Sequence, residues 1–178
     1  MACDLTTGRK VPCKDAVGGL KTVYFIDYGD LGAITYDVTN TDAIDSFGGT
    51  PTAYKYDLKG NSSFEQTVNS SRENGTTFYE QTLNLTLTKL DKATNKELKL
   101  VAYGRPHVIV EDYNGNLFVM GLLHGAEVTG GTIVTGAAMG DLTGYTLVMT
   151  GQEQVAANFI DNTLAAAGVT VSANQINP

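Results

Sequence analysis

The clearest alternation of apolar and polar residues in the chain runs from Phe78 to Leu90. A period of two places successive side chains on opposite faces of a strand. One face is apolar, with Gln81 as its single interruption, and carries Tyr79, Leu83, Leu85 and Leu87. The other face carries small polar side chains: Glu80, Thr82, Asn84, Thr86 and Thr88. Fully extended, such a strand would span roughly 40 Å, more than double the usual length.

A second strand-like run precedes this one, from Phe64 to Ser70, and Asn74-Gly75 lies between the two. Asn-Gly is favoured at the corner of a tight β-hairpin, and it also closes slightly longer hairpin loops. The two runs therefore predict a long hairpin that is apolar on one face and polar on the other.

Other segments also have strand character, and one of them is bulky on both faces. In the segment from Lys21 to Tyr28 the alternate residues are large on either side, which predicts a strand covered on both faces. Asn114-Gly115 predicts a second hairpin. The remaining predicted strands are Leu31–Val38, Ala53–Leu58, His107–Asp112, Leu117–Leu122 and Tyr145–Thr150, with a polar loop over Thr39–Thr52.

One helix is predicted, from Asp91 to Tyr103. Thr94 and Glu97 have the spacing of a capping box, and Gly104 followed by Pro106 ends the segment. With twenty glycines and four prolines, many turns are expected. The chain is therefore predicted to be mainly β, with a single helix across the sheet.

The length of 178 residues fits one domain, with an N-terminal arm over residues 1–20 and a C-terminal arm over about 162–178. A formal net charge of -7 argues against a protein that grips nucleic acid through its phosphates. No apolar run approaches the ~18 residues of a membrane span, and the first residues lack the apolar stretch of a signal peptide. We therefore expect synthesis and assembly in a cytoplasm and no membrane partner.

The two cysteines, Cys3 and Cys13, enclose a short loop in the N-terminal arm. A disulfide between them would contribute roughly 3 kcal/mol in the chain-entropy account, but a reducing cytosol disfavours it. A metal site would need two further ligands. Plain buried thiols and a late-forming disulfide both remain open.

Candidate catalytic and nucleotide-binding motifs are weak. The glycine-rich segment Gly130–Gly144 lacks the Lys and Ser or Thr of a phosphate loop, so a flexible loop that lets another chain approach is expected. His107 is interpreted as a strand-end residue and His124 as a turn residue. The chain therefore offers no convincing catalytic triad, metal site or cofactor site, and we do not expect an enzyme.

Carboxylates occur in three neighbouring sets, none with the ligand spacing of a calcium loop. Adjacent strand residues point to opposite faces, so sequence neighbours cannot cooperate simply by adjacency. A solvated surface is the expectation for all of them: Glu111 with Asp112, Asp42 with Asp45, and Glu73 with Glu80.

What remains is a domain with arms, glycine-rich loops and a long amphipathic hairpin. A strand that is polar on one face and leucine-rich on the other can line a watery channel while its apolar face packs on a core. Rings closed by symmetry also remove exposed sheet edges. This inventory favours an assembly subunit.

Three segments resemble the tail tube (major tail) proteins of tailed bacteriophages, or related virion structural proteins. They are GAAMGDLTGYTLVMTGQEQVAANFID (Gly136–Asp161), CDLTTGRKVPCKDAVGGLKTVYF (Cys3–Phe25) and KYDLKGNSSFEQTVNSSRENGTTFYEQTLNLTL (Lys55–Leu87). The resemblance implies a β-sandwich or split barrel with one flanking helix. It also implies rings, commonly of six subunits, that stack into a hollow tube for DNA.

By this resemblance, Phe64–Leu90 contributes to an inner β-barrel, and Ala43–Pro51 is a loop between rings. The implied lumen-facing residues are Glu80, Thr82, Asn84, Thr86 and Thr88, and the implied contacts between rings are Asp42, Asp45, Phe47, Gly48 and Gly49. The implied partners are copies of the chain and other phage tail proteins, with DNA passing through without specific binding and no cofactor.

Two alternatives share this composition. One is another virion component, such as a capsid decoration or head-to-tail joining protein. The other is a carbohydrate-binding β-sandwich, favoured by nine tyrosines and weakened by the absence of tryptophan.

Overall fold

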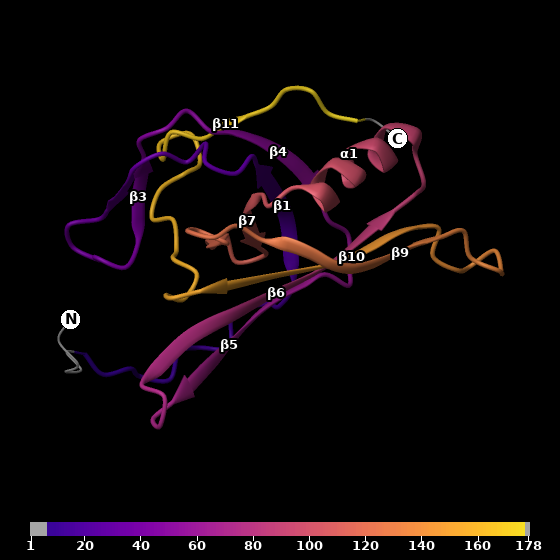
Figure 1. Cartoon of the computed structure of the whole chain (residues 1–178). Helices are drawn as coiled ribbons and strands as arrows, with labels where there is room; N and C mark the ends of the chain where they lie inside the picture. Colours follow the sequence, from indigo (N-terminus) through magenta and orange to yellow (C-terminus); the bar gives the residue numbers. More distant parts are fainter. Residues whose placement is uncertain (1–6, 177–178) are drawn as a thin grey trace.

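The structure is a computed structural model that describes residues 7–176 (Figure 1). Over these residues it is mainly β with one helix, as the sequence predicts, and it contains no closed barrel. The elements are β1 (Leu20–Ile26), β2 (Ile34–Tyr36), β3 (Ile44–Phe47), β4 (Thr52–Asp57), β5 (Ser63–Ser71), β6 (Thr76–Thr88), α1 (Lys92–Tyr103), β7 (His107–Asp112), β8 (Leu117–Met120), β9 (Glu127–Val134), β10 (Gly144–Glu153) and β11 (Thr170–Val171).

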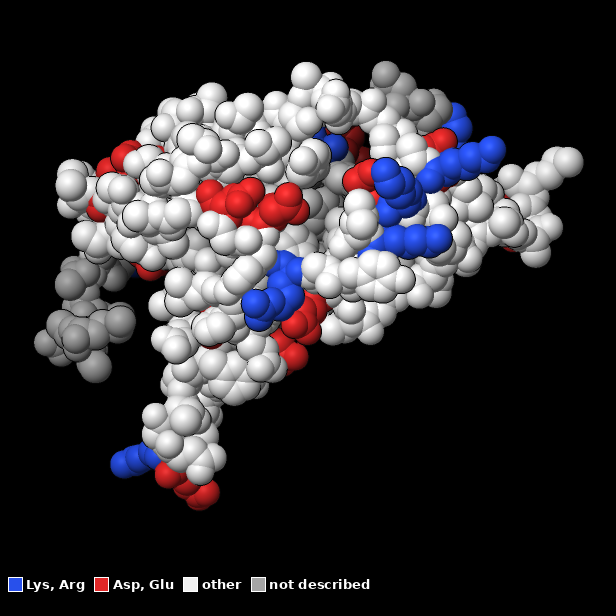
Figure 2. All heavy atoms as spheres, turned by 45° about the horizontal axis from the view of Figure 1, so that its top comes forward, with Lys and Arg blue, Asp and Glu red and all other residues white. Residues whose placement is uncertain are grey.

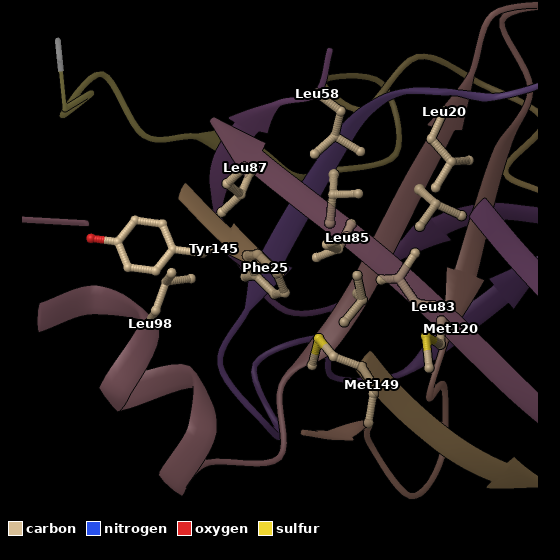
Figure 3. Packing of buried hydrophobic residues seen from close by; sticks show 14 residues of the cluster. Leu20, Phe25, Leu58, Leu83, Leu85, Leu87, Leu98, Met120, Tyr145 and Met149 are labelled. Atoms are coloured by element: carbon tan, nitrogen blue, oxygen red, sulfur yellow. The ribbon is translucent and has the colours of Figure 1, made fainter. Parts of the chain in front are cut away.

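The strands form two principal sheets that pack as a β-sandwich. The larger has the order β11-β4-β1-β7-β8 and is called the large sheet; the other has the order β5-β6-β10-β9 and is called the small sheet. Apolar side chains of both sheets meet in one core, which Figure 3 shows from close by. Leu83 and Leu85 of β6 contribute to it from the small sheet, and Phe25 of β1 contributes from the large sheet. The sandwich therefore covers only one face of the small sheet.

Strand β1 lies at the centre of the large sheet and is buried on both faces, as predicted. Val23 and Phe25 belong to the core shared with the small sheet. Tyr24 and Ile26 belong to a second core on the opposite face, which β3 and the segment near Ile160 cover. A central strand covered on both sides needs bulky residues at every position, which explains its sequence.

Strand β6 has the predicted alternation, and the structure explains its one polar interruption. The Gln81 side chain is buried, and its Oε1 accepts a hydrogen bond from the backbone N–H of Gly121 at 2.9 Å. A buried backbone N–H without a partner costs about 1–3 kcal/mol, so the glutamine satisfies a group that leucine could not.

The predicted long hairpin joins β5 to β6 in antiparallel register, with Ser71 opposite Thr76. Gly75 has φ of 64°, the left-handed conformation that glycine adopts without steric cost. The Asn-Gly pair therefore closes a longer loop over residues 72–75, and the two-residue corner does not form.

Helix α1 forms where predicted, but its N-terminal cap differs. Asp91 has extended backbone angles, and its Oδ2 accepts hydrogen bonds from the N–H groups of Ala93 at 2.9 Å and Thr94 at 3.1 Å. Asp91 is therefore the N-cap, and the predicted capping box at Thr94 is wrong because the helix begins one turn earlier. The Tyr145 hydroxyl donates to the Asp91 carbonyl at 2.9 Å. Leu98 is the buried helix residue, near Tyr145 in Figure 3.

The predicted polar loop before β4 is partly wrong. Ile44 and Phe47 within it are buried in the second core, and residues 44–47 form β3, paired with the short β2. These two apolar side chains pack this otherwise polar segment onto the face of the large sheet that is remote from the small sheet. Phe47 is therefore a core residue and is unavailable as a contact between rings.

The glycine-rich segment is a strand for part of its length. Gly130 and Gly131 lie in β9, and only residues 135–143 form a loop. A Cβ on Gly131 would lie 2.5 Å from the carbonyl oxygen of Thr146 in β10. The close approach that requires glycine at this position is thus a contact within the chain, and the predicted long flexible loop is wrong there.

The C-terminal segment packs on the large sheet more than an arm would. Strand β11 pairs in parallel with β4, and Ala167 and Val169 are buried in the second core. This differs from the expected arm over about 162–178. At the other end, residues 8–18 are exposed, as expected for an arm.

Replacing Leu85 by Ala should lower the free energy of unfolding by about 2–5 kcal/mol, because Leu85 is buried in the shared core and its loss leaves a cavity. Urea unfolding of the purified protein measures this. Thr82→Ala, on the other face of the same strand, is the matched control and should change stability by less than about 1 kcal/mol. Equal effects of the two substitutions would contradict the assignment of faces.

Candidate functional site

One side of the small sheet packs on the core, and the other side is not covered by any element of the chain within residues 7–176. The register of the strands brings polar side chains of all of them to this side. Thr82 lies opposite both Glu65 and Thr150, and Thr146 lies between Thr86 and Thr132. We call this surface the polar face; its residues are Ser63, Glu65, Thr67, Glu80, Thr82, Asn84, Thr86, Thr88, Glu127, Gly130, Thr132, Val134, Gly144, Thr146, Val148, Thr150 and Gln152.

Hydrogen bonds link several of these side chains to neighbouring strands and to the turn before β5. The hydroxyls of Thr132 and Thr146 lie 2.6 Å apart. The Asn84 Nδ2 donates to Ser63 Oγ at 3.4 Å, and the Thr86 hydroxyl donates to the backbone carbonyl of Asn61 at 3.1 Å. The polar face is thus a layer of mostly small polar groups, with Val134 and Val148 as bulky apolar members and Phe78 following on the same side of β6 toward the hairpin tip.

The charge on the polar face is entirely negative. The strands of the small sheet, all of whose residues are described, contain no Lys, Arg or His. Glu65, Glu80 and Glu127 supply its carboxylates. Lys and Arg gather elsewhere, over α1 and at the tip of the β5-β6 hairpin (Figure 2), which carry Lys92, Lys96, Lys99 and Arg72. Cations are therefore absent from the strands of this surface, and at one end of it the basic side chains of Arg105 and His124 line a pocket with Glu80, Glu127 and Gln152.

Both edges of the small sheet are open. Within residues 7–176, no backbone hydrogen bond occupies the outer edge of β5 or of β9. The edge of β8 in the large sheet, in contrast, is covered: Val119 donates to the carbonyl of Asn158 at 3.0 Å, and Ile160 donates to that of Leu117 at 2.9 Å. Unpaired strand edges are templates for pairing with another chain.

The residues predicted to face a lumen all lie on the polar face. Glu80, Thr82, Asn84 and Thr86 are half-buried among their neighbours, and Thr88 is exposed. Their orientation away from the core is confirmed, while their role stays a prediction. The sequence did not identify the rows on β5, β9 and β10 that lie beside them, although alternation in Tyr145–Thr150 was a usable signal.

The residues predicted to contact other rings lie elsewhere and have partners within the chain. The Asp45 Oδ1 accepts from Asn162 Nδ2 at 2.7 Å, and the Asp42 carbonyl and carboxylate accept from Asn158 Nδ2. Gly48 and Gly49 donate backbone hydrogen bonds to Ala33 and Leu31. Together with the buried Phe47, these residues attach the β2-β3 hairpin to the chain, on the side of the large sheet remote from the polar face.

The cysteine pair cannot be placed as a unit. Cys13 is exposed in the N-terminal arm, and Cys3 lies outside the described residues. Among residues 7–176, no three His, Cys, Asp or Glu side chains are grouped to hold a metal ion. In the same part of the chain no helix is long and apolar enough to cross a membrane.

His107 is a buried structural residue at the start of β7. Its Nε2 accepts a hydrogen bond from the Gly29 N–H at 3.1 Å, so its Nδ1 carries the proton and donates to the Gly121 carbonyl at 2.6 Å. The Tyr28 ring stacks on the imidazole, and the Arg105 guanidinium lies over Tyr28. Burial lowers the pKa of His107 below its usual value, which keeps the imidazole neutral.

His124 lies in a turn, as predicted, and pairs with a carboxylate that the sequence analysis missed. Glu153 is buried at the end of β10, where its Oε1 accepts from the N–H groups of Leu123 and His124 and its Oε2 lies 3.0 Å from His124 Nδ1. Glu153 lies four residues after the core residue Met149 in β10, so its side chain points to the same, inward face of the sheet. An acidic residue at an inward-facing strand position is the sequence feature that could have identified it.

A scan against protein-family models found no match, and neither did searches of curated proteins and of solved structures. Function is therefore inferred from the polar face and the two open edges themselves.

The unfolding free energy should fall as the pH drops from about 7.5 to 5.5, in part because of His107. Its folded pKa lies below the unfolded value of about 6.5, so the unfolded chain binds the proton more tightly in this window and stability rises with pH. His107→Gln should show a smaller decrease over the same range in urea titrations. Because both proteins retain His124, a difference between their pH dependences is due to position 107. An identical pH dependence in the variant would contradict the buried neutral imidazole.

Proposed function

We propose that the chain is a structural subunit of a bacteriophage tail tube. Copies join edge to edge into rings, the rings stack into a hollow tube, and the polar face lines the channel that conducts DNA. The observation that carries this proposal is the combination in the small sheet of a polar face whose strands carry no Lys, Arg or His with two unpaired edges. The β-sandwich with its flanking helix and long hairpin is consistent with the sequence resemblance to this class.

The two open edges are complementary in direction and length. All neighbours in the small sheet are antiparallel, so β5 and β9 run in opposite directions. Strand β5 has nine residues and β9 has eight. If β9 of one copy pairs along the full length of β5 in the next copy, Val134 lies opposite Ser63 and Thr132 lies opposite Glu65. The resulting sheet is antiparallel throughout, and a closed ring leaves no edge exposed.

This register gives an ordinary barrel geometry. Following paired residues across the sheet leads from Ser63 to Asn84, Val148 and Gly130, and then to Thr67 of the next copy. Each copy thus shifts the sheet by about four residues, or roughly 13 Å, over strands that occupy roughly 19 Å around the ring. The corresponding strand tilt is about 35°, which lies in the range of closed β-barrels and does not depend on the number of copies.

The polar face must point inward in such a ring, because the large sheet and the helix occupy the opposite side of the small sheet. For six copies, the number that the resemblance implies, the barrel would have about 24 strands and measure roughly 45 Å between opposite backbones. A channel of this width admits a DNA duplex.

The chemistry of the polar face fits passage better than binding. Proteins that hold nucleic acid neutralise phosphates with Lys and Arg, and the strands that form this surface carry neither. Glu65 and Glu80 would repel the phosphates over about 8–10 Å at moderate ionic strength, while threonine and asparagine keep a mobile water layer at the wall. DNA would then slide without a favoured stopping point.

The proposed partners are copies of the same chain and other tail proteins of the virion. Assembly would take place in the cytoplasm of the host bacterium, and the mature site would be the virion tail. The proposal requires neither a cofactor nor a catalytic residue.

A cysteine pair across the proposed joint tests the ring directly. Thr132→Cys with Glu65→Cys, in a chain also carrying Cys3→Ser and Cys13→Ser, should form disulfides between copies. Denaturing gels without reductant should show a ladder that ends at the ring size. Opposed residues of an antiparallel pair have Cβ atoms about 4.5–5.5 Å apart, near enough for a disulfide after a small adjustment.

The matched control shifts one cysteine by a single residue. Thr132→Cys with Gln66→Cys places the two thiols on opposite faces of the sheet, so no ladder is expected. A ladder from both pairs would indicate random collision, and no ladder from either pair would contradict the proposed joint.

Reversing the charge of Glu80 tests the role of the channel wall. Glu80→Lys would place about six cations around each six-membered ring, and we expect DNA ejection from particles built with this variant to slow several-fold while tubes still form. The neutral variant Glu80→Gln is the control and should eject DNA almost normally. DNA-dye fluorescence measures the kinetics of ejection. Ejection of DNA at the wild-type rate by the lysine variant would contradict the proposal.

A further inference from the structure

Strand β9 carries a large apolar side chain on the core-facing side of its open edge. Ile133 pairs with Tyr145 of β10, which is buried in the core shared by the two sheets, so both side chains point to that side. Ile133 is nevertheless 63% exposed, because β9 is the edge strand of the small sheet. The apolar side of the sheet is therefore incomplete at this edge.

A mostly apolar pocket of about 340 Å³ opens at the opposite edge of the same sheet. Its lining includes Phe64 and Gln66 of β5, together with Val17 and Leu20 from the segment that leads into β1. Phe118 of β8 also lines the pocket, and its ring centroid lies 6.2 Å from that of Phe64. Both rings are only half-buried. The chain thus leaves aromatic surface uncovered at the β5 edge.

The proposed joint between copies brings these two features together. It places Thr132 of one copy opposite Glu65 of the next, on the side of the polar face. Antiparallel neighbours advance in step, so the next pair is Ile133 with Phe64, on the core-facing side. Phe64 points to that side because its partner in β6 is the core residue Leu83. The Cβ atoms of such an opposed pair are about 4.5–5.5 Å apart.

The core-facing side of the joint is apolar further along as well. Val68 of β5 pairs with Tyr79 on this side of the sheet and is exposed. The bulge in β9 at Thr129 leaves Val128 on the same side, opposite the core residue Met149. Matching the faces of the two edge strands places Val128 beside Val68. Each open edge therefore offers apolar side chains to the other.

Charges at the other end of the joint also agree with a second copy as the partner. Glu127 is the first residue of β9, and Arg72 directly follows the last residue of β5. Antiparallel pairing brings them to the same end, with Arg72 just beyond the position opposite Glu127 and within reach of its long side chain. The two charges are opposite in sign, which favours this arrangement.

We infer that the apolar core of the sandwich continues across the joint, with Ile133 of one copy seated in the Phe64-Phe118 pocket of the next. This inference rests on the proposed ring and adds the contact that holds neighbouring subunits together. A β-branched side chain opposite an aromatic one is a favourable cross-strand pair, and the contact removes apolar surface of both from water. The occupant of the pocket is a second copy of this chain.

The contact also selects the register of the joint. Backbone hydrogen bonds repeat along a strand edge, so they alone would allow the two strands to slip. A slip by one residue would turn Ile133 toward the channel, and a slip by two would place it opposite Ser62 or Gln66. Ile133 meets the aromatic pair only in the register with Thr132 opposite Glu65.

A matched pair of substitutions at position 133 tests the seat. Valine and threonine have nearly the same shape and differ in the hydroxyl group. Ile133→Thr should raise the protein concentration needed for assembly several-fold, measured by sedimentation velocity, whereas Ile133→Val should assemble almost as the wild type does. Because Ile133 is largely exposed in the single chain, the monomers should unfold at nearly the same urea concentration.

A double-mutant cycle identifies the pocket. Phe118 belongs to the large sheet, so strand pairing alone does not couple it to Ile133. Ile133→Thr combined with Phe118→Leu should raise the assembly concentration by less than the product of the two separate increases. Thr132→Ala, on the other face of the same strand, is the control, and its effect should multiply with that of Phe118→Leu.

The outcomes separate this inference from the proposed ring. If the Thr132 and Glu65 cysteine ladder forms while Ile133→Thr assembles as readily as Ile133→Val, the seat is wrong and the ring stands. A ladder with independent effects of Ile133→Thr and Phe118→Leu would also refute the pocket. If no ladder and no assembly are observed, both proposals are overturned.

Discussion

The structure depends on one constraint in strand β6, which must bury one face and keep the other wet. Its leucines close the core between the two sheets, and the Gln81 side chain accepts a hydrogen bond from the backbone N–H of Gly121, just after β8. Burying those leucines fixes the register of β6, because a slip by one residue would exchange the two faces. The polar row is thereby held outward along the whole strand, and β5, β10 and β9 extend the same division of faces across the small sheet.

The two sheets differ in how their edges are satisfied within a single molecule. The chain covers the edge of its large sheet near β8 with residues 158–160, but within the described residues it leaves both edges of the small sheet unpaired. The same sheet carries the polar face, whose strands contain no Lys, Arg or His. Pairing of the two edges in a ring would satisfy the backbone and turn that face toward a shared channel, so one arrangement would account for both features.

The sequence predicted the parts of the fold that local patterns determine. The alternation in β6, the Asn-Gly hairpins and the single helix are all present, because period, turn chemistry and end signals act over a few residues. Strand β9 was missed because Gly130 and Gly131 have no side chains to show an alternation. Strand β3 was missed because only Ile44 and Phe47 mark it within a polar segment.

The candidate site was predictable only in part, because local patterns determine which way side chains point but not which strands become neighbours. The orientation of Glu80, Thr82, Asn84, Thr86 and Thr88 follows from their own strand. Which strands lie beside them, and which edges stay open, depends on contacts between residues far apart in the chain, such as Thr146 with Thr132 and Thr86. Likewise, the cap residue Asp91 is bound by the Tyr145 hydroxyl of β10, a contact that the local sequence around Thr94 does not reveal.

Electron microscopy of the purified chain, examined at increasing protein concentration, tests the central claim most directly. Subunits whose small-sheet edges pair with one another should appear as closed rings or hollow filaments with an open central channel. A protein that stays monomeric at every concentration, with both sheet edges solvated, would contradict the account.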